Sequence, residues 1–88
     1  LFRSLGIVMA LVSSFKNRSV DDKTIIFGEV GLAGEVRAVS QPQLRVNEAV
    51  KLGFETCILP QVCLKSIRKT DKINIIGVRN VSEAMKLI

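Results

Sequence analysis

The chain has 88 residues, of which 48% are hydrophobic and 24% are charged, and its formal net charge is +5. This length allows at most one domain with a modest core, and the composition excludes a disordered or low-complexity chain. The positive charge favours a polyanionic partner such as nucleic acid, although a solvated basic surface without a specific partner agrees with it equally well.

The first predicted element is a helix over residues 5–15, where apolar side chains recur at helical spacing (Leu5, Val8, Met9, Val12, Phe15). Further apolar residues extend this surface around the helix, so we expect it to be the covered, central helix of the domain. The apolar run is too short to span a bilayer, and we expect no membrane contact. Because the chain does not begin with Met, we expect a domain that is truncated at its N-terminal side and belongs to a longer protein.

A strand is predicted over Thr24–Phe27, which is β-branched and aromatic. Glycines follow at positions 28, 31 and 34, and residues 28–39 are typical of two short strands joined by a turn. For Gly28, Gly31 and Gly34 we favour a role in turn geometry over ligand binding.

A helix is predicted to open at Ser40–Gln41–Pro42, because proline suits the first helical turn, and to end at Gly53. Its inward positions are expected to be Val46, Ala49, Val50 and Leu52.

The remaining elements alternate. We predict a strand over 54–59 that stops at Pro60, a short helix over 61–69, a strand over 73–78 and a last helix. The apolar side of the short helix is expected to be Val62, Cys63 and Ile67. Asn80 and Glu83 form a capping-box pattern at the start of the last helix, whose buried stripe is expected to be Val81, Ala84, Met85 and Ile88. This order predicts an α+β fold with a partly parallel sheet and packed helices, with α/β as the nearest alternative.

The two cysteines, Cys57 and Cys63, have a C-x5-C spacing, and the chain has no histidine. This pattern does not indicate zinc, and a disulfide between the two is conceivable but not implied. Cys57 lies in an apolar run and is typical of a buried small hydrophobe. We expect a reducing, cytoplasmic setting, no metal and no cofactor.

Residues 27–39, Phe-Gly-Glu-Val-Gly-Leu-Ala-Gly-Glu-Val-Arg-Ala-Val, resemble the G-E-[VI]-x-L-x-G-x-[VI] hairpin of Lon protease domains, and residues 45–60 resemble the next helix and strand. The version found here, with Ser-Ser-Phe-Lys-Asn-Arg at 13–18 and Lys-Leu-Gly-Phe at 51–54, is most similar to the RadA/Sms family. The resemblance covers almost the whole chain. It implies a Lon-protease-like (ribosomal protein S5 domain 2-like) fold, of which residues 1–88 are the C-terminal part.

The RadA/Sms resemblance also implies a function. Proteins of that family combine a zinc-binding N-terminus, a RecA-like ATPase and this Lon-like domain, assemble as hexameric rings and act in recombinational DNA repair. The present chain contains no Gly-x4-Gly-Lys-Ser/Thr phosphate loop, so it does not include the ATPase part.

Lon enzymes use a serine nucleophile that a lysine activates, because a serine hydroxyl needs a nearby base. The resemblance places the lysine position at Gln43, whose amide is not a base, and the serine position at Ser4 or, by another anchor, at Phe2. Lys51 lies two turns further along the predicted helix, on its wrong side. We therefore expect no catalytic residue, and a Lon-type Ser-Lys protease is the alternative.

The strongest remaining feature is positive charge, which predicts binding to the phosphates of single- and double-stranded DNA without sequence readout. With four Phe and no Trp or Tyr, base stacking is expected to add little. For the basic residues at 65–72, the alternative is a solvated helix end and loop. For Arg37 and Arg45, an intersubunit contact is a further alternative. A third hypothesis for the function of the chain is a pure oligomerisation module, in which the basic surface plays no part. The candidate DNA-binding residues are Lys16, Arg18, Arg37, Arg45, Lys65, Arg68, Lys69 and Lys72.

Overall fold

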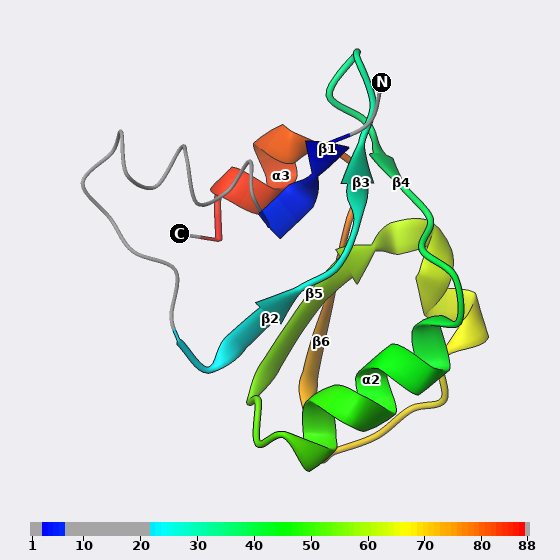
Figure 1. The fold of residues 1–88 in the computed structure, drawn as a ribbon, viewed down its shortest axis with the longest axis vertical. Coiled ribbons are helices and arrows are strands. Elements are labelled where there is room, and N and C mark those ends of the chain that lie inside the picture. The colour runs from blue at the N-terminus through cyan, green and yellow to red at the C-terminus, as the bar shows by residue number, and fades with distance from the viewer. Residues whose placement is uncertain (1–2, 7–21, 88) are drawn as a thin grey trace.

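The computed structural model describes residues 3–6 and 22–87. Two three-stranded sheets form the framework (Figure 1). One is antiparallel, with the order β1 (Arg3–Ser4), β3 (Glu29–Val30) and β4 (Val36–Arg37). The other is parallel, with the order β2 (Thr24–Ile26), β5 (Thr56–Pro60) and β6 (Asn74–Val78). The predicted mixed fold with parallel strands is therefore confirmed, and the glycine-rich hairpin belongs to a separate sheet.

Two helices and a 3-10 helix complete the described chain: α2 (Pro42–Lys51), η1 (Gln61–Ser66) and α3 (Val81–Met85). Figure 1 shows α2 beside the parallel sheet, whereas α3 lies at the other end of the molecule with β1 and β3. Of the predicted N-terminal helix, Leu5 and Gly6 are helical, and positions 7–15 lie outside the described residues.

The parallel sheet is covered on both faces, as parallel sheets usually are. Successive side chains of a strand point to opposite faces, and β5 follows this rule. Cys57 and Leu59 pack with Val46 and Ala49 of α2, whereas Ile58 packs with Ala84 and Met85 of α3. This is why the apolar run of β5 is continuous rather than alternating.

Gly28 lies where the chain passes from β2 into β3. Its φ of 147° suits glycine, and an added Cβ would lie 3.1 Å from a methyl group of Val36. Gly34, with φ 83°, provides the turn of the hairpin. Gly31 has no positive φ; instead, an added Cβ would lie 2.5 Å from the Glu35 carboxyl group. The predicted role in turn geometry thus holds for two of these glycines, and close approach explains the third.

Two inward positions were predicted incorrectly. Leu52 is 71% exposed because α2 ends at Lys51 and Leu52 already lies in the turn that follows. Val62 is 55% exposed because residues 61–66 form a 3-10 helix instead of the predicted α-helix over 61–69. With three residues per turn, positions i and i+3 align, and Leu64 and Ile67 pack against the core with the buried Cys63.

The predicted cap of α3 is confirmed in one half. The Asn80 side chain accepts a hydrogen bond from the Glu83 backbone N–H at 2.8 Å. The Glu83 carboxylate does not complete the reciprocal box at Asn80 but accepts the backbone N–H of the preceding residue, Arg79, at 2.6 Å. Val81, Ala84 and Met85 pack against the core as expected, whereas Ile88 lies outside the described residues.

Cys57 and Cys63 are both buried and free, so the structure contains no disulfide between them.

Candidate nucleic-acid interface

The segment Arg68–Lys72, which we call the basic loop, joins η1 to β6. All five of its residues are exposed. The loop is held at both ends by apolar side chains, because Ile73 is buried and Ile67 packs against the same cluster beneath α2. The sequence places Arg68, Lys69 and Lys72 in this short span, so the fold presents three cations on one exposed segment.

A hydrogen bond ties the basic loop to α2. The backbone N–H of Arg68 donates to Oε1 of Gln43 at 2.7 Å. The other end of the same amide is also engaged, since Nε2 of Gln43 donates to Oδ1 of Asn47, one helical turn along, at 2.9 Å. Gln43 therefore lies between its own helix and the loop, with both amide atoms used.

Between α2 and the basic loop runs an open groove of about 370 Å³, which we call the basic groove. Lys51 contributes a fourth cation from the α2 side and lies 3.6 Å from the Glu48 carboxylate. Within the part of the chain that the structure describes, Arg68, Lys69 and Lys72 form no ion pair. Their positive charge is therefore not neutralised by a neighbouring carboxylate in contact with it, and it remains available to an anionic ligand. The cations that line the groove are Lys51, Arg68, Lys69 and Lys72.

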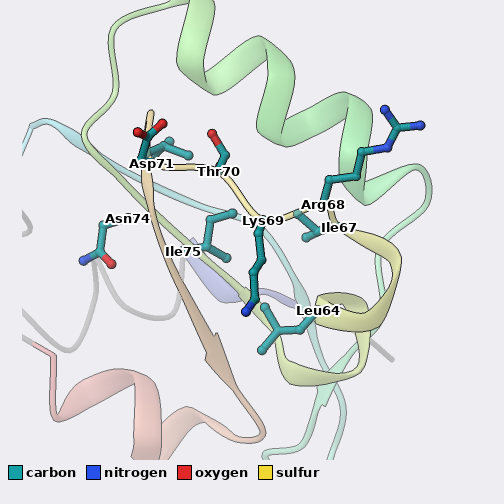
Figure 2. A pocket seen from close by; sticks show the side chains of 9 residues that line it. Leu64, Ile67, Arg68, Lys69, Thr70, Asp71, Asn74 and Ile75 are labelled. Atoms are coloured by element: carbon teal, nitrogen blue, oxygen red, sulfur yellow. The ribbon is translucent and has the colours of Figure 1, made fainter.

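A second, larger hollow of about 760 Å³ lies on the other side of the basic loop. Its walls include the apolar side chains of Leu64, Ile67 and Ile75 (Figure 2). In that view Lys69 extends toward Leu64, whereas Arg68 points the other way, toward the end of α2. Both residues line the basic groove as well as this hollow.

The other candidate cations lie elsewhere. Lys65 is exposed on η1 and lines neither hollow. The Arg37 guanidinium lies 3.2 Å from the Glu35 carboxylate on the hairpin. Arg45 lies over the Phe27 ring at 5.5 Å and donates from Nε to the Ser40 carbonyl at 2.8 Å. Lys16 and Arg18 lie outside the described residues.

The two positions that the resemblance to Lon enzymes assigns to the serine and the lysine belong to different parts of the fold. Ser4 lies on β1, paired with Glu29 of β3. Gln43 is in the first turn of α2, and Figure 1 shows β1 and α2 at opposite ends of the molecule. Phe2 lies outside the described residues.

Over residues 3–6 and 22–87, no group of three His, Cys, Asp or Glu side chains is arranged to hold a metal ion. None of the helices in this same part of the chain is both long and apolar enough to cross a membrane.

The family described as Lon protease (S16) C-terminal proteolytic domain matches residues 3–88. The chain belongs to this Lon-type domain family. The glycine-rich hairpin, α2 and the parallel sheet are thus parts of a Lon-type domain.

Among curated proteins, this Lon-type chain is similar to several bacterial sequences named DNA repair protein RadA. It is 45% identical to that of Bacillus subtilis over 82 residues, which is 93% of this chain and 18% of the relative. It is 42% identical over 83 residues to that of Halalkalibacterium halodurans, covering 94% of this chain and 18% of the relative. The Streptococcus pneumoniae protein is 36% identical over 84 residues, 96% of this chain and 20% of the relative. The chain thus spans about a fifth of the length of these relatives.

Sequence reasoning missed two parts of the basic groove. Lys51 is not among the predicted DNA-binding residues, yet α2 carries it to the wall opposite the basic loop. Gln43 was considered only as a lost catalytic position. No local pattern indicates its hydrogen bond to Arg68, because the two residues are 25 positions apart.

Proposed function

We propose that this chain is a non-catalytic module that binds DNA and takes part in oligomer assembly within a RadA/Sms-like ATPase of recombinational DNA repair. In this proposal it is the C-terminal part of a Lon-like domain of the ribosomal protein S5 domain 2-like class, and it acts in the cytoplasm. The similarity to proteins named DNA repair protein RadA supports the biological setting.

The basic groove is the observation that carries the DNA-binding part of the proposal. Four cationic side chains line it, from both α2 and the basic loop, and one carboxylate, that of Glu48, lies among them. Lysine and arginine contacts to phosphates supply affinity without reading sequence. A groove open to solvent and lined in this way suits a nucleic-acid backbone, and we expect both single- and double-stranded DNA to bind.

Gln43 supports the non-catalytic part. A carboxamide nitrogen donates hydrogen bonds and has no basic lone pair, so it cannot remove a proton from a serine hydroxyl. Lys51 does not take over this role from its position, because it lines the basic groove beside Glu48.

The DNA-binding proposal is tested by fluorescence anisotropy with labelled 20-nucleotide single strands and duplexes at several salt concentrations. We expect Lys69→Glu to weaken duplex binding by roughly tenfold at 0.1 M salt and to lower the salt slope by about 0.9. Lys86→Glu makes the same change in net charge just after α3, away from the groove, and is the matched control. Equal effects of the two variants would show that only net charge matters and would exclude the basic groove as the DNA site.

The assembly part needs a separate measurement, because a pure oligomerisation module would not use the basic groove. Light scattering of the full-length protein is expected to show a ring-sized oligomer. We further expect the Lys69→Glu protein to assemble like the unmodified protein while binding DNA less tightly. Assembly without any DNA binding at moderate salt would favour the oligomerisation reading instead.

A Lon-type serine protease is the second candidate, because the matching family is described as proteolytic. This reading predicts turnover of fluorescent casein that Ser4→Ala abolishes. We expect no turnover by the chain. We expect none from Gln43→Lys either, since Ser4 and Gln43 belong to elements at opposite ends of the molecule.

A further inference from the structure

The hydrogen bond between Gln43 and the basic loop has a consequence for the proposed DNA site. Between Ile67 and Ile73 the described backbone donates one other hydrogen bond to a side chain, from the Lys72 N–H to Oγ1 of Thr70 at 3.1 Å, and that bond is internal to the loop. Among the hydrogen bonds of the described residues, the one to Gln43 is therefore the link between the basic loop and another element. It joins the two walls of the basic groove.

The chemistry of this link requires an acceptor. A backbone N–H only donates, so the atom facing Arg68 must be an oxygen, and the amide provides it. The Asn47 contact at 2.9 Å holds the NH₂ end of the amide against α2, which leaves Oε1 directed at the loop. A lysine ammonium carries three donors and no acceptor, and it could not make this bond. Position 43 therefore needs a side chain with an acceptor, which glutamine provides and lysine does not.

We propose that Gln43 is a positioning residue for DNA binding. Its side-chain oxygen holds the basic loop against α2. Arg68, Lys69 and Lys72 are thereby placed to contact, together with Lys51, one phosphate backbone. This inference rests on the proposed DNA-binding function and adds the residue that organises the site. A loop of five exposed residues without this link would have to be ordered by the ligand, and that ordering lowers affinity.

The decisive variant is Gln43→Met, which keeps the length and the net charge and removes the acceptor. We expect duplex affinity to fall by about three- to tenfold, the range that one hydrogen bond between protein groups is worth. We expect the backbone amide of Arg68 to exchange with deuterium faster, and the salt slope of binding to become shallower. The melting temperature should change little, because the bond lies on an exposed surface.

Gln43→Glu is the conservative comparison, since it keeps an acceptor for the Arg68 N–H. Protection of the Arg68 amide should survive in Gln43→Glu and be lost in Gln43→Met. Gln61→Met, on η1, makes the same chemical change at an exposed glutamine outside both hollows and should leave DNA binding unaltered.

The outcomes separate this inference from the function on which it rests. If Lys69→Glu weakens binding more than Lys86→Glu but Gln43→Met leaves affinity and salt slope unchanged, the groove binds DNA and the positioning role is overturned. If Lys69→Glu and Lys86→Glu act alike, the DNA site itself is overturned, and the positioning role falls with it. Loss of Arg68 protection together with lower affinity in Gln43→Met supports both.

Discussion

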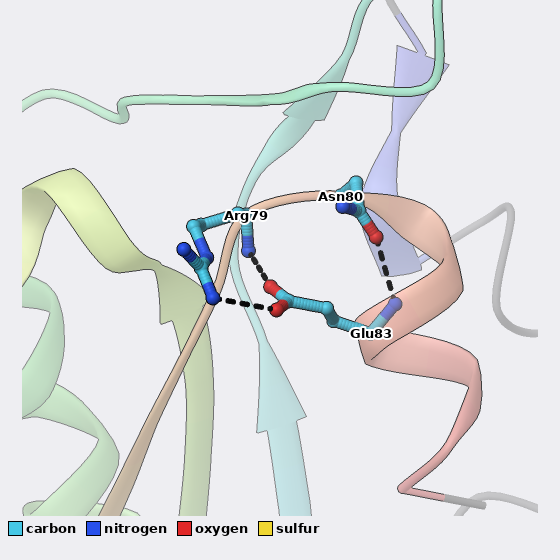
Figure 3. Close-up of polar contacts among 3 residues, drawn as sticks. All are labelled: Arg79, Asn80 and Glu83. Carbon is cyan, nitrogen blue, oxygen red and sulfur yellow. Dashed lines mark hydrogen bonds and ion pairs between the residues drawn. The ribbon is translucent and has the colours of Figure 1, made fainter.

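The Glu83 carboxylate holds Arg79 by two contacts, one to its backbone N–H at 2.6 Å and one to its guanidinium at 3.2 Å (Figure 3). The Asn80 side chain caps the same helix by accepting the Glu83 N–H. These bonds lie where the chain leaves β6 and begins α3. The Arg79 carbonyl also accepts the Val36 N–H at 2.9 Å, so this corner joins the hairpin to the rest of the molecule.

This corner predicts a pH-dependent contribution to stability. The backbone and side-chain hydrogen bonds from Arg79 lower the pKa of Glu83 below that of an ordinary glutamate. A lowered folded-state pKa gives stability that is present above the unfolded pKa, about 4.3, and is lost as the pH falls through the folded value. We expect Glu83→Gln to unfold at lower urea concentration at pH 7 and to approach the unmodified protein below pH 4. A difference in unfolding midpoint between the variant and the unmodified protein that stays constant from pH 7 to pH 3 would contradict this role of the Glu83 charge.

A second prediction concerns Gly77 on β6, which lies under η1. An added Cβ would lie 2.7 Å from a methyl group of Leu64 and 3.1 Å from the Cα of Gln61. Because part of this crowding is backbone, Gly77→Ala should destabilise the fold by about 1–3 kcal/mol, as overpacking does. Urea unfolding measures the loss. Leu64→Ala in the same chain should recover part of it, and strictly additive effects of the two substitutions would argue against the contact.

Gly53 tests a different property of glycine. It follows α2 with φ 87°, and an added Cβ would meet no atom within 4 Å. Gly53→Ala should therefore destabilise through backbone strain alone, by about 1 kcal/mol. Gly53→Asn should cost less, because asparagine tolerates the left-handed region better than alanine. Equal losses of stability for the alanine and asparagine variants in thermal unfolding would show that backbone strain at position 53 is not the cause.

Cys57 is predicted to be chemically inert in the folded chain. Burial raises the pKa of the Cys57 thiol to about 11, and the thiolate is the reactive form. Iodoacetamide at pH 7.5 should therefore modify Cys57 only after denaturation, and mass spectrometry of digested samples would report the site. Rapid modification of Cys57 in native protein would show that the strand opens or that the thiol is ionised.

Much of the architecture was predictable from local patterns. The β-branched run before Gly28, the proline at the start of α2 and the Asn80 cap each act within a few residues, so they can be read along the chain. The predictions failed where a change of helical period or an early helix end decided exposure. Val62 and Leu52 show this, because neither the 3-10 geometry of η1 nor the end of α2 at Lys51 is marked by residue type alone.

The sequence by itself determined the order of the elements, the excess of positive charge and the absence of an amine base at position 43, because these depend on residue type and on neighbours close in the chain. Only the tertiary structure decided which cations share a groove. Lys51 and Arg68 line the same groove because β5 and η1 carry the chain back past α2. The bond from Arg68 to Gln43 likewise joins residues 25 positions apart, and such pairs are brought together by packing of the core rather than by any local preference.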